Sequence, residues 1–129
     1  MNALALAYLG DAVYELAIRE HVLSKGNYRQ HELHKRSVAY VSAKAQAGII
    51  KELEPQLSDE EIAIVKRGRN TKGHAAPKNT DVTQYRYSTG FETLVGHLYL
   101  SKNSERLAEI ISFAIEYVEV SAKNEQAKK

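Results

Sequence analysis

Apolar residues recur every three to four positions along most of the chain, which is the spacing of an amphipathic helix. The pattern lapses near Pro55 and Pro77, and the stretches around them are rich in Ala, Leu, Ile, Glu and Lys, which favour helix. Asn2 is a candidate N-cap, and residues 58–61 match a capping box. We predict helices over approximately residues 2–24, 31–36, 40–54, 58–67, 81–100 and 103–120.

Residues 68–80, GRNTKGHAAPKNT, contain almost no large apolar side chain. They are expected to form a long exposed loop, which in a compact domain is usually functional or mobile. The tail SAKNEQAKK, residues 121–129, is expected to fray. A chain of 129 residues can bury the core of one domain. The sequence therefore predicts a single all-α domain over residues 1–120, followed by the tail.

Two of the predicted helices are apolar on almost every side, and each carries one isolated carboxylate. Residues 3–13 are apolar except for Gly10 and Asp11, and Glu92 is the only charged residue between residues 86 and 102. A helix that is apolar all round must be covered all round, by the core of its own chain or by a second subunit. Burying an unpaired carboxylate is costly unless a cation or several hydrogen bonds compensate. We therefore expect Asp11 and Glu92 to converge in low-dielectric surroundings.

Two converging carboxylates raise each other's pKa unless a metal ion lies between them. A site with oxygen ligands and few protein groups suits Mg²⁺, which keeps several of its waters. Gly10 precedes Asp11, and Gly96 lies one turn beyond Glu92. A glycine within a helix costs about 1 kcal/mol relative to alanine, which a close helix crossing or a close approach of the substrate would explain. The alternative is that each carboxylate only bonds backbone amides or a nearby arginine. The pair with matching glycines favours a metal site in which Asp11 and Glu92 are the catalytic ligands.

Composition excludes several other classes of site. The chain has no cysteine, so thiol catalysis, zinc–thiolate sites and iron–sulfur clusters are excluded, and a reducing cytoplasmic location is expected. The first apolar stretch has no basic segment before it and is interrupted by Asp11 and Glu15. We therefore expect neither a signal peptide nor a membrane span.

The segment around Asp11, LALAYLGDAVYELAIR, resembles the signature of the ribonuclease III family, whose core is Leu-Gly-Asp-Ala/Ser-Val, here residues 9–13. Residues 91–100, FETLVGHLYL, are similar to the family's second motif, Phe-Glu-Ala-Leu-Ile-Gly-Ala-Leu-Tyr-Leu. Both motifs in this order, about 80 residues apart, are highly specific. The segments VSAKAQA and KRGRNTKGHAAPKNTDVTQYRYST resemble the Mini-III subgroup, a short form without a double-stranded-RNA-binding domain.

Typical family members carry a Glu four residues before the signature Asp and an Asp three residues before the second Glu. This chain has Ala7 and Thr89 at those positions. Mini-III proteins are similar in this respect and are active, so by analogy we expect activity here. The metal ion would then be held more by water and RNA phosphate than by protein groups.

The resemblance implies a ribonuclease III endonuclease-domain helical fold and a symmetric homodimer whose signature helices pack together, with one active centre per RNA strand. It also implies Mg²⁺ as cofactor, with Mn²⁺ as a substitute, and hydrolysis of double-stranded RNA to products with 5′ phosphates. The implied substrate is precursor large-subunit (23S) ribosomal RNA. Two alternatives remain open: a non-catalytic RNA-binding or ribosome-associated member of the same fold, and a helical interaction module without RNA. The retained Asp11 and Glu92 argue against the first.

Positive charge is concentrated in residues 66–86, where Asp81 is the only acid, although the net charge of the chain is only +2. Arginine can contact phosphate with two hydrogen bonds, and lysine acts as a point charge. A solvated surface loop is the simpler interpretation, but the position of these residues shortly before Glu92 favours a binding role. The basic bias itself argues against a module without RNA. The candidate RNA-binding residues are Lys44, Lys66, Arg67, Arg69, Asn70, Lys72, Lys78 and Arg86.

Overall fold

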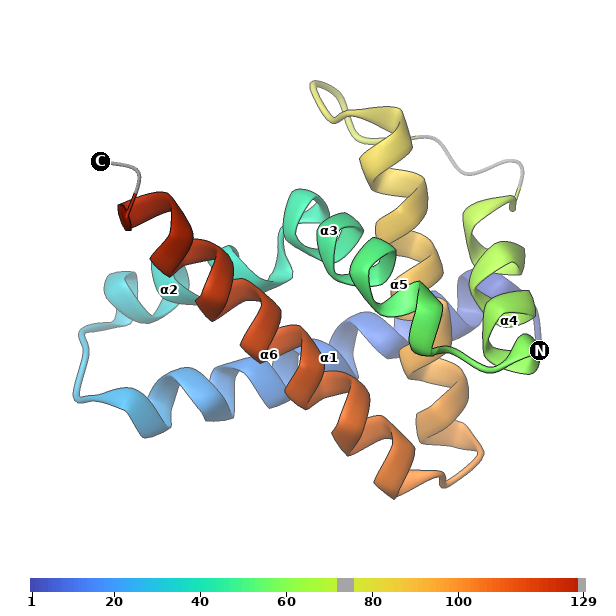
Figure 1. The fold of residues 1–129 in the computed structure, drawn as a ribbon, viewed down its shortest axis with the longest axis horizontal. Helices are drawn as coiled ribbons and strands as arrows, with labels where there is room; N and C mark the ends of the chain where they lie inside the picture. Colours follow the sequence, from blue (N-terminus) through green and yellow to red (C-terminus); the bar gives the residue numbers. More distant parts are fainter. Residues whose placement is uncertain (72–75, 128–129) are drawn as a thin grey trace.

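A computed structural model describes residues 1–71 and 76–127 (Figure 1). Its elements are α1 (Ala3–Lys25), α2 (Gln30–Val41), α3 (Ala43–Leu53), the short 3₁₀ helix η1 (Glu54–Gln56), α4 (Asp59–Arg69), α5 (Val82–Leu100) and α6 (Ser104–Ala127). The described part of the chain contains no strand, so the predicted all-α fold is confirmed. None of its helices is both long enough and apolar enough to cross a membrane.

Side-chain caps fix the beginnings of three helices where the sequence predicts them. The Asn2 side chain accepts a hydrogen bond from the Ala5 amide at 2.8 Å and begins α1. Ser58 and Glu61 form the predicted capping box of α4, and Asp81 caps α5. These bonds satisfy backbone N–H groups that have no partner within the helix, so local sequence is enough to locate these ends.

The predicted boundary between the second and third helices, around residues 37–39, is wrong. Helix α2 continues to Val41, and the break falls at Ser42, whose backbone is extended. The Ser42 hydroxyl accepts a hydrogen bond from the Ala45 amide at 3.2 Å. A serine that bonds the backbone in this way offers the chain an alternative to continuing the helix.

Helix α6 also differs from its predicted extent. It continues to Ala127 instead of ending near Val120. The added turns contain Ala, Lys, Glu and Gln, all good helix formers, and these residues are largely exposed. Intrinsic propensity is therefore sufficient to extend the helix where the apolar pattern has already stopped.

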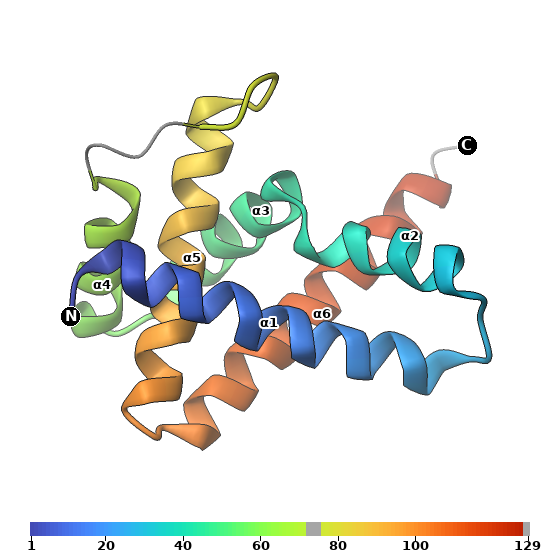
Figure 2. The same ribbon diagram turned by 180° about the vertical axis from the view of Figure 1, so that it is seen from behind.

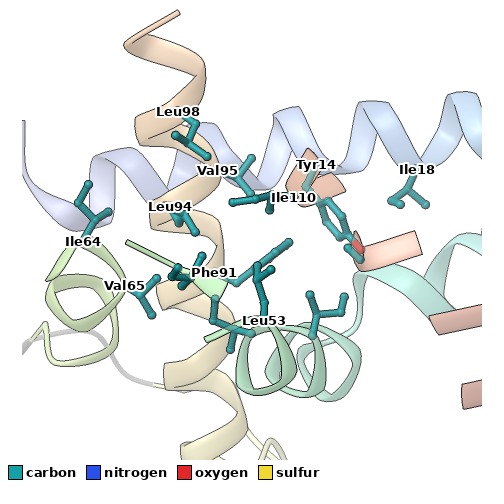
Figure 3. Packing of buried hydrophobic residues seen from close by; sticks show 14 of the residues in the cluster. Tyr14, Ile18, Leu53, Ile64, Val65, Phe91, Leu94, Val95, Leu98 and Ile110 are labelled. Carbon is teal, nitrogen blue, oxygen red and sulfur yellow. The ribbon is translucent and has the colours of Figure 1, made fainter. Parts of the chain in front are cut away.

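Helix α5 lies at the centre of the fold and packs against α1, α3 and α4 (Figures 1 and 2). Figure 3 shows its side chains among those of the surrounding helices. Phe91 meets the ring of Tyr14 from α1 edge to face, with centroids 5.0 Å apart. This aromatic contact and the aliphatic residues around it hold the middle of α5, where Glu92 lies, against α1 and α3.

Helix α6 crosses the bundle diagonally in Figure 1 and is held by a polar contact near each end. Arg106 donates to both carboxylate oxygens of Glu61, at 2.8 and 2.9 Å. At the other end Glu119 accepts from the Tyr40 hydroxyl at 2.9 Å and lies 2.8 Å from His21 Nε2. These contacts join α6 to α4, α2 and α1.

Helix α1 is covered on one side only. Its inner face buries Leu6, Tyr14 and Ile18, whereas Tyr8 is 86% exposed and Leu16 61% exposed. In Figure 2 this helix lies in front of the bundle, and no other described element covers it. The sequence left two possibilities for this helix, cover by the core of its own chain or cover by a second subunit. The first of these is therefore wrong.

Candidate active site

The site lies where α1 crosses α5, and two glycines set how closely the helices approach. A Cβ atom added at Gly10 would overlap the backbone carbonyl of Glu92, and one added at Gly96 would overlap the carbonyl of Leu6. The predicted close crossing is therefore confirmed. Because the two backbones are in contact at this point, the side chains beside the glycines are held side by side.

The structure brings the predicted catalytic carboxylates together. Asp11 follows Gly10 on α1, and its carboxylate is within hydrogen-bonding reach of that of Glu92 on α5. Burial raises the pKa of Glu92 to about 8, and the neighbouring Asp11 contributes to the same shift by its hydrogen bond and its charge. Without a cation this pair retains a proton near neutral pH.

The expectation that both carboxylates are buried is only partly correct. Glu92 is half-buried, and Asp11 is exposed. The reason is the open outer side of α1, where the chain itself supplies no cover for Asp11. The pair therefore presents one half-buried carboxylate and one solvent-facing carboxylate.

Three further side chains act on Glu92 or are affected by it, and none was predicted as part of the site. Glu15 on α1 raises the pKa of Glu92 through its charge, and Gln46 on α3 donates a hydrogen bond to Glu92 Oε2 at 3.4 Å. Burial, assisted by the charge of Glu92, raises the pKa of Tyr85, two turns earlier on α5. Glu15 could have been found from its spacing of one turn after Asp11. Gln46 is neutral and distant in sequence, so it gives no comparable signal.

The oxygen donors of this site fit Mg²⁺ or Mn²⁺. Two adjacent carboxylates would supply negative charge, and a cation between them would offset the repulsion that raises the pKa of Glu92. Among the described residues no group of three or more His, Cys, Asp or Glu side chains could hold a metal ion. Asp11 and Glu92 would therefore be the main protein ligands, with water and phosphate completing the coordination.

The two positions where typical family members carry additional carboxylates are occupied here by buried, uncharged residues. Ala7 is 7% exposed and Thr89 is 4% exposed. The Thr89 hydroxyl donates to the carbonyl of Tyr85 at 3.0 Å, within its own helix. Neither position can supply a charged ligand without a change in the surrounding packing.

Most of the predicted RNA-binding residues lie at the end of α4, in the turn that precedes α5 or in the first turns of α5. Those in the described part of the chain are exposed, except for Arg69, which is half-buried. Lys44 lies apart from them, exposed in the first turn of α3. Lys72 falls outside the described residues. The candidates at the α4 end and the α5 start are Lys66, Arg67, Arg69, Asn70, Lys78 and Arg86.

Tyr87 organises part of this basic surface. The Arg69 guanidinium lies 5.4 Å from the centre of its ring, and the ammonium of Lys51 on α3 lies 4.7 Å from it. Such contacts orient cations at a surface. Lys51 was not predicted as an RNA-binding residue, because its place beside Arg69 depends on the packing of α3 against α5.

Comparison with known proteins agrees with this geometry. Residues 4–103 match the pattern of the ribonuclease III domain. The chain belongs to the ribonuclease III family and is an endoribonuclease. Within the family it is similar to Mini-ribonuclease 3 of Symbiobacterium thermophilum, with 50% identity over 116 residues, covering 90% of this chain and 89% of that protein. The predicted resemblance to the Mini-III subgroup is thereby confirmed.

Other relatives give the same result. Mini-ribonuclease 3 of Brevibacillus brevis is 49% identical over 118 residues, covering 92% of this chain and 88% of that protein. A crystal structure of a protein from Fusobacterium nucleatum matches the fold with a TM-score of 0.81 at 37% identity, covering 90% of this chain and 93% of the other. The similarity thus extends over nearly the whole chain in both sequence and fold.

The raised pKa of Glu92 predicts a specific dependence of stability on pH in the metal-free protein. The folded protein holds a proton that the unfolded chain releases from about pH 4.5, so stability falls as pH rises from there to about pH 8. Glu92→Gln cannot ionise, so its melting temperature should fall less across this window. At pH 8 the variant should melt no lower than the parent.

Thermal melting in chelator at pH 5, 6.5 and 8 measures this effect. Glu52→Gln, which changes an exposed carboxylate on α3, is the matched control and should follow the parent. A Glu92→Gln variant that melts well below the parent at pH 8 would show instead that the carboxylate stabilises the fold.

Proposed function

We propose that this protein is a magnesium-dependent endonuclease that hydrolyses double-stranded RNA as a homodimer and leaves 5′ phosphates. The observation that carries the proposal is the pair Asp11 and Glu92, held together at the α1–α5 crossing. Its oxygen donors suit a hard divalent cation. A basic surface on α4 and α5 adjoins the same helix that carries Glu92.

In this mechanism Asp11 and Glu92 would hold the cation, and their proximity favours a cation in place of the proton on Glu92. When bound, Mg²⁺ would lower the pKa of a coordinated water and stabilise the negative charge that develops on the leaving 3′ oxygen. The basic residues of α4 and α5 would hold the RNA phosphates. An RNA duplex is recognised mainly by its A-form shape, its phosphates and its 2′-hydroxyls, so weak sequence preference is expected.

Precursor large-subunit (23S) ribosomal RNA is the natural substrate that we propose, on the strength of the resemblance to the Mini-III subgroup. The absence of cysteine agrees with a reducing cytoplasmic location, where such precursors are processed. A non-catalytic RNA-binding role is the second candidate, because Ala7 and Thr89 replace two carboxylates. It does not account for the retention of Asp11 and Glu92 at a crossing where their mutual repulsion is unfavourable.

A second copy of the chain is the partner that we propose for the open face of α1. Tyr8, Leu16 and Leu23 are each at least 60% exposed and lie on the same side of this helix. An apolar stripe on a helix is normally buried, and a two-fold dimer brings the same stripe of each copy together. Asp11 lies beside this stripe, so the dimer would place two active centres near the interface.

Divalent cations should determine whether the protein cuts RNA. With Mg²⁺ or Mn²⁺ an end-labelled RNA duplex should be cleaved, whereas Ca²⁺ should support binding without turnover because its looser coordination aligns water poorly. Asp11→Asn should reduce cleavage by orders of magnitude while leaving binding in Ca²⁺ largely intact. Gel analysis of the products measures both effects, and cleavage that persists in excess chelator would exclude this mechanism. A protein that binds the duplex but never cuts it would support the non-catalytic role.

The basic surface should govern affinity for the duplex. Replacement of Arg67, Lys78 and Arg86 by alanine should weaken binding and lower the slope of log affinity against log salt by roughly one for each phosphate that the variant no longer neutralises. Fluorescence anisotropy in Ca²⁺ at several salt concentrations measures both quantities. The control replaces three exposed lysines on other parts of the molecule and should leave the slope close to that of the parent: Lys25, Lys35 and Lys123. Equal slopes for the two triple variants would place the RNA on another surface.

The open face of α1 should be the dimer interface. Leu16→Glu would bring two like charges together across the two-fold axis, so the variant should sediment as a monomer at concentrations where the parent is a dimer. Its helix content should be unchanged, because Leu16 is 61% exposed within its own chain. Val120→Glu, at a 47% exposed position on α6, is the control and should remain dimeric. A parent that sediments as a monomer at micromolar concentration would contradict the proposal.

A further inference from the structure

Gln46 is a buried polar residue in contact with the candidate metal site. It lies in the first turns of α3, just after the break at Ser42, and is 2% exposed. Its Nε2 donates to the carbonyl of Val41 at 3.0 Å and to Glu92 Oε2 at 3.4 Å. The side chain therefore joins the end of α2 to the carboxylate on α5.

These two contacts fix the orientation of the amide. Val41 O and Glu92 Oε2 are both acceptors, so only the NH₂ group of Gln46 can face them. The Gln46 NH₂ group therefore holds one oxygen of the Glu92 carboxylate while it is itself anchored on Val41.

Within the described part of the chain, the amide oxygen of Gln46, Oε1, has no hydrogen-bond donor to match the two acceptors that its NH₂ group contacts. Gln46 Oε1 is buried and accepts no hydrogen bond from any described residue. Buried polar atoms in native proteins nearly always have a partner, and leaving one unsatisfied costs about 1–3 kcal/mol. A residue retained only to join α2 to α3 would need the bond to Val41 and nothing more.

We propose that Gln46 is a positioning residue of the metal site: its NH₂ group orients the Glu92 carboxylate, and its Oε1 accepts a hydrogen bond from a water bound to the metal ion. The proposal rests on the proposed function, since it needs a divalent cation at Asp11 and Glu92. Partners of this kind, which contact the ligands and not the metal, commonly set both the orientation of a ligand and the affinity for the ion. A metal-bound water would give Oε1 the donor that the protein does not supply.

Gln46→Met tests the role, because methionine has a similar length and volume but cannot make these hydrogen bonds. The half-saturating Mg²⁺ concentration for cleavage and the dissociation constant for Mn²⁺, measured by electron paramagnetic resonance, should both rise by about 10- to 100-fold. Affinity for the RNA duplex in Ca²⁺ should be unchanged. The metal-free variant should melt close to the parent, because the change also removes an unsatisfied buried acceptor.

A structural role predicts the opposite combination, a lower melting temperature with unchanged Mn²⁺ affinity. Thr93→Val provides the control for a lost buried hydrogen bond between helices, since the Thr93 hydroxyl bonds only backbone carbonyls, those of Thr89 and Ala3. This control should lower the melting temperature and leave the Mn²⁺ dissociation constant unaltered. Gln46→Asn, whose amide is one methylene shorter and does not reach Glu92, should repeat the metal effect if the methionine variant does not fold.

The outcomes separate this inference from the proposed function. Mn²⁺ affinity and Mg²⁺ dependence equal to those of the parent, in whichever Gln46 variant is folded, would overturn the positioning role while leaving the endonuclease mechanism intact. A parent that binds no Mn²⁺ and cleaves without a divalent cation would overturn the proposed function, and this inference with it.

Discussion

The contact between the backbones of α1 and α5 is the constraint on which the rest of the structure depends. At Gly10 and Gly96 there is no room for even one additional carbon atom. The contact places Asp11 beside Glu92, and it directs the remaining sides of α5 toward α3 and α4. Larger residues at either glycine would separate the two helices and with them the two carboxylates. The unfavourable propensity of glycine within a helix is thus offset by a geometry that no other residue permits.

The site formed by this crossing is asymmetric. Glu92 is half-buried where α5 meets α1 and α3, and this partial burial raises its pKa, whereas Asp11 faces solvent. A half-buried carboxylate held between helices is suited to keep an ion in one position, because its side chain has less freedom and its charge is less screened than at the open surface. An exposed carboxylate can exchange ligands and admit a large substrate. The closed positions at Ala7 and Thr89 leave most of the coordination of any bound ion to water and phosphate.

The same asymmetry extends to the surfaces around the site. One side of α1 packs into the core, and the other presents three large apolar side chains together with Asp11 and Arg19. Basic side chains gather at the end of α4 and the beginning of α5. Lys51 of α3 and Arg69 of α4 both lie over the ring of Tyr87. An apolar surface and a basic surface therefore adjoin one pair of carboxylates, which is an arrangement suited to a dimer that binds an extended polyanion.

Sequence by itself determined the features that are local or chemically unusual. Helix beginnings at Asn2, Ser58 and Asp81 follow from side chains that bond the next few backbone amides, and Asp11 and Glu92 are conspicuous as isolated charges in apolar helices. Only the tertiary structure decided which face of α1 remains open, and therefore that Asp11 is exposed. Only packing showed the contact of Gln46 with Glu92, which lies 46 residues away in the sequence. A helical pattern specifies which residues share a face, but the neighbours of that face depend on long-range packing, and a neutral amide leaves no trace in charge or periodicity.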